Sequence, residues 1–582
     1  MELVKRPLMS ESETRKVLSD VALGNIAADT VITHGTLFNV FTREFIPEQS
    51  VWIKNGRIAY VGPDHDPSRT EKTDVIDAHG MVLLPGLIDG HTHLASTKST
   101  ADEFVKHVIP GGTTTVVTET MDLAFIAGED GVKHWVKSFE NQPIRIYYTV
   151  PVLCGLTPSE EMNALSAEEL LSYLKDPHCL GLGEIYWSNL FLPGPRGDRI
   201  FDLASAALNL GKRIEGHTAG ASGRKLQAYS CLGVSSCHEP ITVSETLERI
   251  RLGYWTMIRE GSVRRELEGV REVFTRNIDF RRVILCTDSV DAVDILERGY
   301  LEDSLRKMLR LGVRPEVAYQ MVTINAAEHF RLDDQIGSLA PGRMADIVLI
   351  PSPGEFSPQL VLCDGKVIYK DGKILAQPRR VPFPDNLLDT VKALPFTLPS
   401  LPSKGKVRAI ELVSNLVTKE TILDLDDSGA AKDLLMILAL NRLGKEGSFL
   451  GFIKGFGLNE GALGSTLNWD TGDMVVIGCD PLSMTTVVER LKKIRGGYVY
   501  AISKDVVAEL ATPVCGFLSY EPMEILRDSM KKLERVLQEK GVKWEKPLTT
   551  LDTLTTPAIP HIRITHSGYV RLRDRAVLSC NV

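Results

Sequence analysis

The sequence predicts an α/β protein with a (β/α)8 TIM-like barrel, a composite β-sandwich domain built from both flanks of the barrel, and an additional α/β C-terminal domain. Three observations predict this fold class. The chain has 582 residues, which is enough for roughly three or four domains of ordinary size. Residues 83–338 alternate short apolar strands with helical stretches, which is the pattern and length of a barrel. Segments rich in hairpin signals flank that region on both sides.

The composite domain is predicted from residues 1–82 and 339–385. In the first segment, apolar residues alternate on both sides of Asn55-Gly56, and Asn-Gly supplies the positive φ angles of a tight hairpin turn. The second segment has the same texture, with turns at Asp364-Gly365 and Asp371-Gly372. Because these β segments flank a long middle region, we expect them to complete one sandwich around an inserted barrel.

The barrel and the C-terminal domain follow from the remaining segments. Residues 83–338 contain strand-like runs such as TTTVVT, KRIEGH and VILCTD between helical stretches. A doubly wound sheet would alternate in a similar way, but no GxGxxG follows a strand. The Pro-rich residues 386–406 are predicted to be a linker. Residues 407–582 mix strands such as MVVIG with helices such as MTTVVERLKKI, which indicates a further domain.

Composition and charge exclude several classes of partner. The 67 basic and 75 acidic residues give a net charge of 67 − 75 = −8, and no long basic run is present for nucleic-acid binding. No apolar run approaches the roughly 20 residues of a membrane span, and the charged start lacks the apolar core of a signal peptide. Nine cysteines without CxxC spacing do not indicate a disulfide framework. We expect a cytoplasmic homo-oligomer that acts on a small molecule.

The segment PGLIDGHTHL is the strongest chemical signal, with His91 and His93 after an apolar run. Residues two apart in a strand point to the same face, so both imidazoles can reach one metal ion. The carboxyl ends of barrel strands also house the active site. A bare HxH pair is more often two unrelated histidines, so the interpretation depends on further ligands.

Further candidate ligands follow later strand-like runs. Glu184 ends the run GLGE, His217 follows KRIEG, His238 follows VSSC, and Asp288 follows VILCT. Each residue alone is weak evidence, because a single carboxylate or histidine is usually structural or solvated. Four histidines and two carboxylates that all follow strands are together typical of a divalent-metal hydrolase.

These residues lie in motifs through which nearly the whole chain resembles the adenine deaminases of the amidohydrolase superfamily. The matching motifs are PGLIDGHTHL, GGTTTVV, GLGE, EGHTAGASGRKLQAY, GVSSCHE, MIREGS, ILCTD, INAAEHF, SLAPGRMADIVL, KGFGLNEGALGSTL, PVCGFLSYEP and LTTPAIPHIRIT. The resemblance implies a barrel, a composite β domain and a C-terminal domain. It also implies hydrolytic deamination of adenine to hypoxanthine and ammonia.

The resemblance implies two divalent metal ions, which His and carboxylate ligands allow to be manganese, iron or zinc. His91, His93 and Asp288 would bind the more buried ion, His217 and His238 would bind the second, and Glu184 would bridge them. A hydroxide between the two ions would attack C6 of the purine. Asp288 and Glu184 are therefore the expected catalytic residues, with Asp288 carrying the proton from the water to the departing ammonia.

The sequence departs from the family pattern close to this site. Ala95 stands where the family has a carboxylate, Met121 lies in a segment that replaces Asp-Pro-His-Glu, and Ser289 replaces a second aspartate. The segment Asn468–Asp473 replaces a histidine-bearing sequence. These changes spare every expected metal ligand and alter what surrounds the substrate. The candidate substrate-binding residues are Trp187, Ser289 and Asp122, with Trp187 either stacking on a planar ring or packing at the rim.

Two alternative functions are compatible with these departures. One is a related amidohydrolase that acts on an N6-substituted purine or another heterocyclic amide or amidine. The other is a catalytically silent homologue, against which the retention of all six expected ligands argues. Mononuclear zinc deaminases with H-x-E and P-C-x-x-C elements are disfavoured because neither element occurs.

Overall fold

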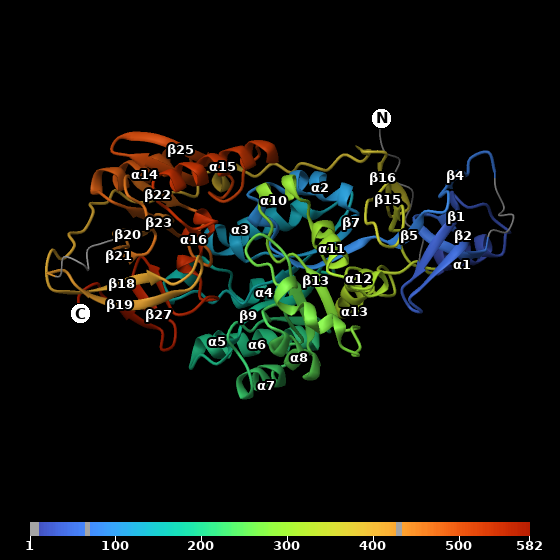
Figure 1. The fold of residues 1–582 in the computed structure, drawn as a ribbon, viewed down its shortest axis with the longest axis horizontal. Helices are drawn as coiled ribbons and strands as arrows, with labels where there is room; N and C mark the ends of the chain where they lie inside the picture. Colours follow the sequence, from blue (N-terminus) through green and yellow to red (C-terminus); the bar gives the residue numbers. More distant parts are fainter. Residues whose placement is uncertain (1–10, 64–69, 427–432) are drawn as a thin grey trace.

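The computed structural model describes residues 11–63, 70–426 and 433–582. Residues 1–10 and 64–69, which belong to the expected first segment, lie outside the described residues, as do residues 427–432 of the expected C-terminal domain. In Figure 1 a β sheet containing β1 and β2 stands at one end of the molecule, the strands β7, β9 and β13 lie in the middle, and the strands β18–β25 lie at the other end.

Eight parallel strands form the central part, in a five-stranded sheet of order β10-β9-β8-β7-β6 and a three-stranded sheet of order β11-β12-β13. Thr92 and Asp288 form a parallel bridge that joins β6 to the segment after β13. At the other junction, the amide of Ser235 donates to the carbonyl of Ile214 at 3.0 Å. This is a TIM-barrel-type arrangement. The strands are β6 (Leu87–Thr92), β7 (Thr113–Glu119), β8 (Arg145–Val150), β9 (Cys179–Tyr186), β10 (Arg213–His217), β11 (Ser236–Cys237), β12 (Trp255–Arg259) and β13 (Val283–Cys286).

Helices lie between these strands along the chain, and their starts can be traced to the sequence. Ser166 and Glu169 form a capping box at the start of α4, and Thr242 and Glu245 form another at α8, so each helix begins where its free amides are satisfied. Within the described residues, no helix is both long and apolar enough to cross a bilayer. The main helices of this region are α2 (Ala101–Val108), α3 (Met121–Phe139), α4 (Ala167–Leu174), α6 (Pro195–Asn209), α7 (Arg224–Cys231), α8 (Val243–Arg251), α11 (Leu301–Arg310), α12 (Pro315–Met321) and α13 (Ile324–Phe330).

A nine-stranded sheet draws strands from both flanks of the central region, in the order β17-β16-β15-β14-β5-β1-β2-β3, with β4 paired to β1. The join is an antiparallel pairing of β14 with β5, in which Leu349 faces Leu83. Both residues of the Asn55-Gly56 turn have positive φ, as do both residues at Asp364-Gly365 and Asp371-Gly372, so the three predicted turns are confirmed. The strands are β1 (Thr30–Asn39), β2 (Glu44–Lys54), β3 (Arg57–Pro63), β4 (Asp74–Asp77), β5 (Val82–Pro85), β14 (Ile347–Ile350), β15 (Leu360–Cys363), β16 (Lys366–Lys370) and β17 (Lys373–Ile374).

The C-terminal region is built on an eight-stranded sheet of order β19-β18-β21-β20-β23-β22-β24-β25 and a small antiparallel sheet of β26, β27 and β28. The helices expected from MTTVVERLKKI and MEILRDSMKKLERVLQEKG are present as α14 (Pro481–Lys493) and α15 (Met523–Glu539). The strands are β18 (Lys406–Leu412), β19 (Thr418–Asp424), β20 (Leu434–Asn441), β21 (Ser448–Lys454), β22 (Ala462–Ser465), β23 (Asp473–Gly478), β24 (Gly497–Ile502), β25 (Asp505–Ala511), β26 (Ile562–Thr565), β27 (Gly568–Arg571) and β28 (Ala576–Leu578).

Buried polar contacts attach the C-terminal region to the mouth of the central strands. Lys98, which follows β6, places Nζ 3.8 Å from Oδ2 of Asp552, and both side chains are buried. The amide of Ser519 donates to the carbonyl of Lys98 at 2.8 Å. These contacts bring C-terminal segments over the strand ends that carry the expected metal ligands.

Candidate metal centre and active site

His91 and His93 lie at the carboxyl end of β6, and the backbone of Asp288 holds both of them. The amide of Asp288 donates to the carbonyl of His91 at 3.0 Å, and the amide of His93 donates to the carbonyl of Asp288 at 2.5 Å. Asp288 adopts φ 61°, a left-handed conformation that turns the chain immediately after β13. The two strand ends are therefore fixed against each other at the residues that carry the site.

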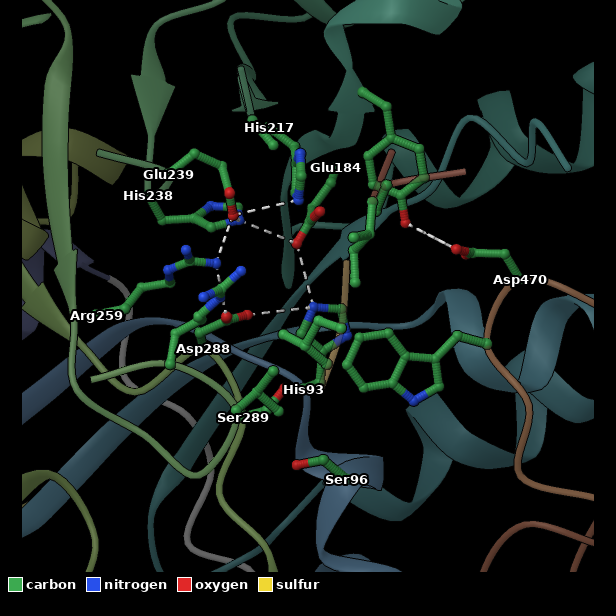
Figure 2. Close-up of a pocket in the computed structure, with 18 of the residues that line it drawn as sticks. His93, Ser96, Glu184, His217, His238, Glu239, Arg259, Asp288, Ser289 and Asp470 are labelled. Atoms are coloured by element: carbon green, nitrogen blue, oxygen red, sulfur yellow. Dashed lines mark hydrogen bonds and ion pairs between the residues drawn. The ribbon is translucent and has the colours of Figure 1, made fainter. Parts of the chain in front are cut away.

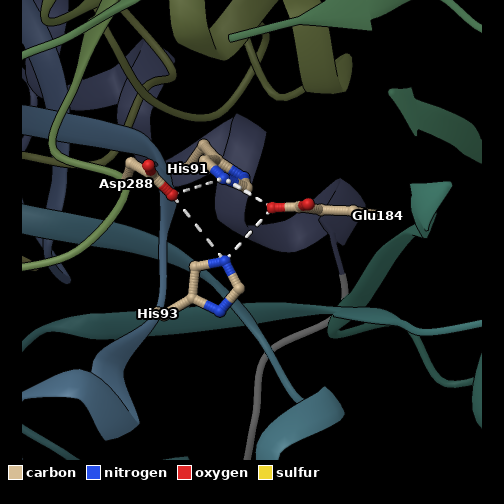
Figure 3. A group of neighbouring side chains, drawn as sticks. All are labelled: His91, His93, Glu184 and Asp288. Atoms are coloured by element: carbon tan, nitrogen blue, oxygen red, sulfur yellow. Dashed lines mark hydrogen bonds and ion pairs between the residues drawn. The ribbon is translucent and has the colours of Figure 1, made fainter. Parts of the chain in front are cut away.

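Glu184 near the end of β9 lies between the two histidines of β6 and a third histidine. Its Oε1 is 3.2 Å from Nε2 of His91, 3.1 Å from Nε2 of His93 and 3.5 Å from Nε2 of His238. Figure 3 shows that Asp288 faces the same two β6 imidazoles from the other side. Gly183 allows this placement, since a Cβ there would stand only 2.6 Å from Cβ of Glu215 on β10.

Two groups of side chains in the described residues meet at Glu184, and both have the composition of a metal site. The first consists of His91, His93, Glu184 and Asp288, and the second of Glu184, His217 and His238, with ligand atoms within 4.8 Å of one another in each group. Donor atoms bound 2.0–2.2 Å from a divalent ion lie roughly 3 to 3.5 Å apart, which matches the spacing around Glu184. The donors are imidazole nitrogens and carboxylate oxygens, a set that suits zinc, iron and manganese.

The electrostatics of the first group also fit a cation. Burial would lower the pKa of His91, but hydrogen bonding and charge interaction with Asp288 and Glu184 raise it to about 10. Nε2 of His91 is buried, and two carboxylate oxygens stand 3.2 and 3.4 Å away. A bound cation would take the place of the proton between this nitrogen and the carboxylates.

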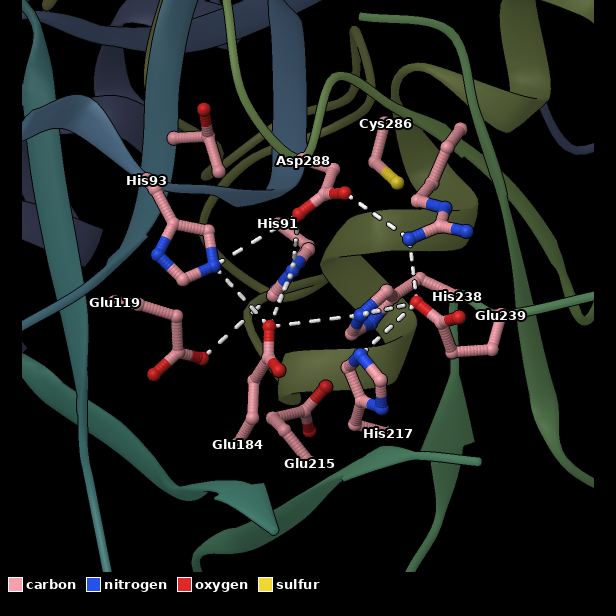
Figure 4. Close-up of polar contacts among 12 residues, drawn as sticks. His91, His93, Glu119, Glu184, Glu215, His217, His238, Glu239, Cys286 and Asp288 are labelled. Carbon is pink, nitrogen blue, oxygen red and sulfur yellow. Dashed lines mark hydrogen bonds and ion pairs between the residues drawn. The ribbon is translucent and has the colours of Figure 1, made fainter. Parts of the chain in front are cut away.

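Arg259 on β12 binds the outer side of this cluster. Its Nη1 donates to Oδ2 of Asp288 at 3.2 Å and also to Oε1 of Glu239. Burial would raise the pKa of Asp288, but His91 and Arg259 hold it well below the ordinary value, so Asp288 is ionised at neutral pH. Glu239 directly follows His238, and its Oε1 lies 3.2 Å from Nε2 of His217 (Figure 4).

A second layer of acids lies behind the ligands. Oε1 of Glu119, at the end of β7, is 3.8 Å from Nδ1 of His91, on the side of the ring away from Glu184. Burial raises the pKa of Glu119 to about 7, against the opposing effect of His91. Glu215 forms a buried pair with His329 at 2.8 Å. A carboxylate on the far nitrogen of a ligand histidine orients the ring and increases its basicity.

A cavity of about 300 Å³ borders this cluster, and residues of the C-terminal region form part of its lining. This volume is within the range of small-molecule sites, and most of the exposed wall area is apolar, although many charged and polar side chains also line the cavity. Figure 2 places Asp470 across the cavity from Glu239, His238 and Arg259. The C-terminal residues of the lining are Leu416, Val417, Trp469, Asp470, Phe517, Ala558, Ile559 and Pro560.

The predicted substrate-binding residues differ in position. Asp122 and Ser289 line the cavity, and Oδ2 of Asp122 is 3.8 Å from Nδ1 of His93. Trp187 is not among the described residues of the lining, because its Nε1 donates to the carbonyl of Ala219 at 2.8 Å and its ring packs under the Lys225 ammonium. Trp187 therefore lies outside the cavity lining.

Of the positions that depart from the family pattern, some line the cavity and others do not. Met121 and Asp470 line the cavity, whereas Ala95 is buried outside its lining. Asn468 is turned away and donates to the carbonyl of Leu551 at 3.3 Å. Asp473 accepts a hydrogen bond from the ring of His566 at 2.8 Å and is not part of the cavity lining.

Sequence reasoning did not select Glu239, Arg259 or Asp470 for the site. Glu239 stands in the motif GVSSCHE beside a proposed ligand, and Arg259 stands at the end of a strand in MIREGS. Asp470 lies in the segment that departs from the family pattern. Position after a barrel strand was a usable signal for the first two residues, whereas Asp470 reaches the site only through contact between distant parts of the chain.

A TIM-barrel-type sheet with clustered histidines and carboxylates at its carboxyl edge is typical of hydrolases of the amidohydrolase class. The sequence agrees, since the model of the amidohydrolase family matches residues 82–368, and that of the adenine deaminase C-terminal domain matches residues 413–576. The adenine deaminase of Moorella thermoacetica is 34% identical over 588 residues, with 97% of each chain covered. Those of Desulforamulus reducens and Cenarchaeum symbiosum are each 31% identical, covering 96% and 98% of this chain and 97% and 95% of their own. The chain belongs to the adenine deaminase family.

Proposed function

We propose that this protein hydrolyses adenine to hypoxanthine and ammonia. The observation that carries the proposal is that two groups of possible metal ligands share Glu184 on the wall of a cavity of about 300 Å³. Membership of the adenine deaminase family supports the same substrate. The largely apolar walls suit an uncharged planar ring.

Two divalent ions, of manganese, iron or zinc, fit the ligand groups. His91, His93 and Asp288 would hold one ion, His217 and His238 would hold the other, and Glu184 would contact both. Such ions lower the pKa of a water molecule and polarise the ring that the water attacks.

Asp288 is the residue that we assign to proton transfer. Its carboxylate accepts a proton from the water that attacks C6 and returns it to the amino group, so ammonia leaves and the oxygen stays on the ring. Arg259 holds Oδ2 of Asp288, which leaves Oδ1 directed to His91 and His93. Ser289 and Asp122 line the same cavity and are positioned to contact the substrate.

In the domain organisation that we propose, the cavity lies between the barrel and the C-terminal domain. Residues 83–338 supply the metal ligands, and residues 407–582 close the cavity after a linker at 386–406. Residues 1–82 and 339–385 form the composite β domain, and the sharing of one sheet by β1–β5 and β14–β17 supports that division.

The test is to purify the protein with each metal supplied and to measure ammonia and hypoxanthine from adenine. Wild-type protein is expected to release one of each per adenine, and Asp288→Asn is expected to lose at least a thousandfold in rate. Guanine, cytosine and N6-methyladenine serve as comparison substrates. Turnover of another ring without turnover of adenine would refute the proposed substrate.

A further inference from the structure

We propose that Asp470 is a specificity-determining residue that accepts a hydrogen bond from a ring N–H of the purine and thereby selects the free base over rings substituted at that nitrogen. This inference rests on the proposed function, because it takes the amino-bearing carbon to lie at the metal centre. It assigns a substrate contact to the C-terminal region. Both groups of possible metal ligands at Glu184 consist of residues that precede this region.

Asp470 stands on the cavity wall opposite the ligand histidines. It lies between β22 and β23, its side chain is buried, and it lines the cavity together with its neighbour Trp469. The hydroxyl of Tyr186 donates to Oδ2 of Asp470 at 3.1 Å and lies 3.3 Å from Oδ1. The hydroxyl of Thr556 also donates to Oδ2.

The carboxylate of Asp470 has more acceptor capacity than these partners use. Burial raises its pKa to about 6, against the lowering effect of Thr556 and Tyr186, so it is ionised at neutral pH. A carboxylate has about four lone-pair positions, and only two hydroxyl groups donate to Asp470 among the described residues. No described lysine, arginine or histidine forms an ion pair with it. A buried anion without a cation is stabilised by each further donor.

Asp470 and the expected metal ligands line the same cavity, and Tyr186 contacts both. The ring centroid of Tyr186 is 5.0 Å from that of His217, and its hydroxyl is 3.1 Å from Oδ2 of Asp470. A planar substrate beside Tyr186 can therefore contact the cluster and Asp470 together. With C6 of a purine at the cluster, the imidazole edge of the purine reaches toward Asp470.

An ionised carboxylate distinguishes the nitrogens of that edge. It can accept a hydrogen bond and cannot donate one, so it attracts the ring N–H and repels nitrogen lone pairs. Methylation or ribosylation of the ring nitrogen removes its N–H. The buried carboxylate of Asp470 then loses this hydrogen-bond donor. Sites built to bind a donor reject analogues that lack it for this reason.

The test compares inhibition constants of hypoxanthine with those of 7-methylhypoxanthine and 9-methylhypoxanthine, measured against adenine turnover. We expect wild-type protein to bind hypoxanthine about 10- to 100-fold more tightly than at least one methylated ring. In Asp470→Asn, that ratio is expected to fall to a few-fold, mainly through weaker binding of hypoxanthine.

The matched control is Asp473→Asn, which lies three residues later. Asp473 is buried and binds His566, but it does not line the cavity, so this variant is expected to keep the wild-type ratio. Equal binding of all three rings by wild-type protein would overturn the inference, and so would an equal loss for all rings in Asp470→Asn. Absence of adenine turnover in wild-type protein would instead overturn the proposed function, and this inference with it.

Discussion

Arg259 donates a hydrogen bond from Nη1 to Oδ2 of Asp288 at 3.2 Å, on the side of the carboxylate away from His91. The guanidinium is buried and is itself held by Glu239. Asp288 is therefore fixed on one oxygen by an arginine and directed toward the ligand histidines with the other. This contact makes Arg259 a positioning residue for the proposed proton carrier.

Replacement of Arg259 by Gln is expected to lower kcat by about 10- to 100-fold, because a hydrogen bond to a charged group contributes about 1.5 to 3 kcal/mol. Bound metal per chain is expected to stay unchanged, since Arg259 is not in either ligand group. Arg264→Gln is the control, because Arg264 lines the same cavity without a hydrogen bond to Asp288. An unchanged kcat in the Arg259 variant would show that the contact does not position Asp288.

Replacement of Gly183 by Ala is expected to weaken metal binding about 10- to 100-fold, as changes that misplace a ligand commonly do. A Cβ at Gly183 would meet the carbonyl oxygen of Glu215 at 2.8 Å, so β9 would have to move and take Glu184 with it. Competition with a chelator measures the affinity. Gly312→Ala is the control, because Gly312 also has positive φ but no atom within 4 Å of the added Cβ. Equal metal affinity in both variants would contradict the role of Gly183.

The sequence places the six proposed ligands at the ends of five strands, and the structure brings their side chains together into two groups at Glu184. His91, His217 and Asp288 each stand at or just beyond a strand end, so strand patterning together with residue type locates them. The C-terminal residues that line the cavity could not be located in this way. Asp470 reaches the cavity through packing between regions more than 280 residues apart, as its bond to Tyr186 shows. Trp187 was a reasonable candidate for stacking, but the local bond of its indole to Ala219 decides its position.

Glu103 is expected to give a pH-dependent contribution to stability. Burial would raise its pKa, but hydrogen bonds from His107, the amide of Met523 and Lys106 lower it to about 2 from 4.5. A lowered folded-state pKa means that the carboxylate stabilises the protein above about pH 4.5 and that this contribution is lost as the pH falls toward 2.

Comparison of Glu103→Gln with wild-type protein tests this contribution. At pH 7 the variant is expected to be less stable by about 2 to 3 kcal/mol, and the gap in melting temperature is expected to narrow as the pH is lowered from 5 to about 3. Glu268→Gln, at an exposed helical position, is the control and is expected to melt with wild-type protein throughout. A gap that stays constant over this range would contradict the assigned role of Glu103.

Removal of metal is expected to lower stability as well as activity. The first ligand group places Glu184 and Asp288 beside two histidines, and an ion that binds this group only in the folded protein stabilises the fold. Dialysis against a chelator should therefore reduce the melting temperature, and addition of manganese, iron or zinc should restore it. In His238→Gln the restoration should be incomplete. A melting temperature that does not respond to chelation would argue against a bound ion at this position.

The most direct measurement of the whole account is the rate of hypoxanthine formation from adenine as metal-free protein is titrated with Mn²⁺. The account predicts no product without metal, a rate that rises until about two ions are bound per chain, and a rate about a thousandfold lower at every loading in Asp288→Asn. Absence of hypoxanthine at full metal loading, or equal rates in wild-type protein and Asp288→Asn, would contradict it.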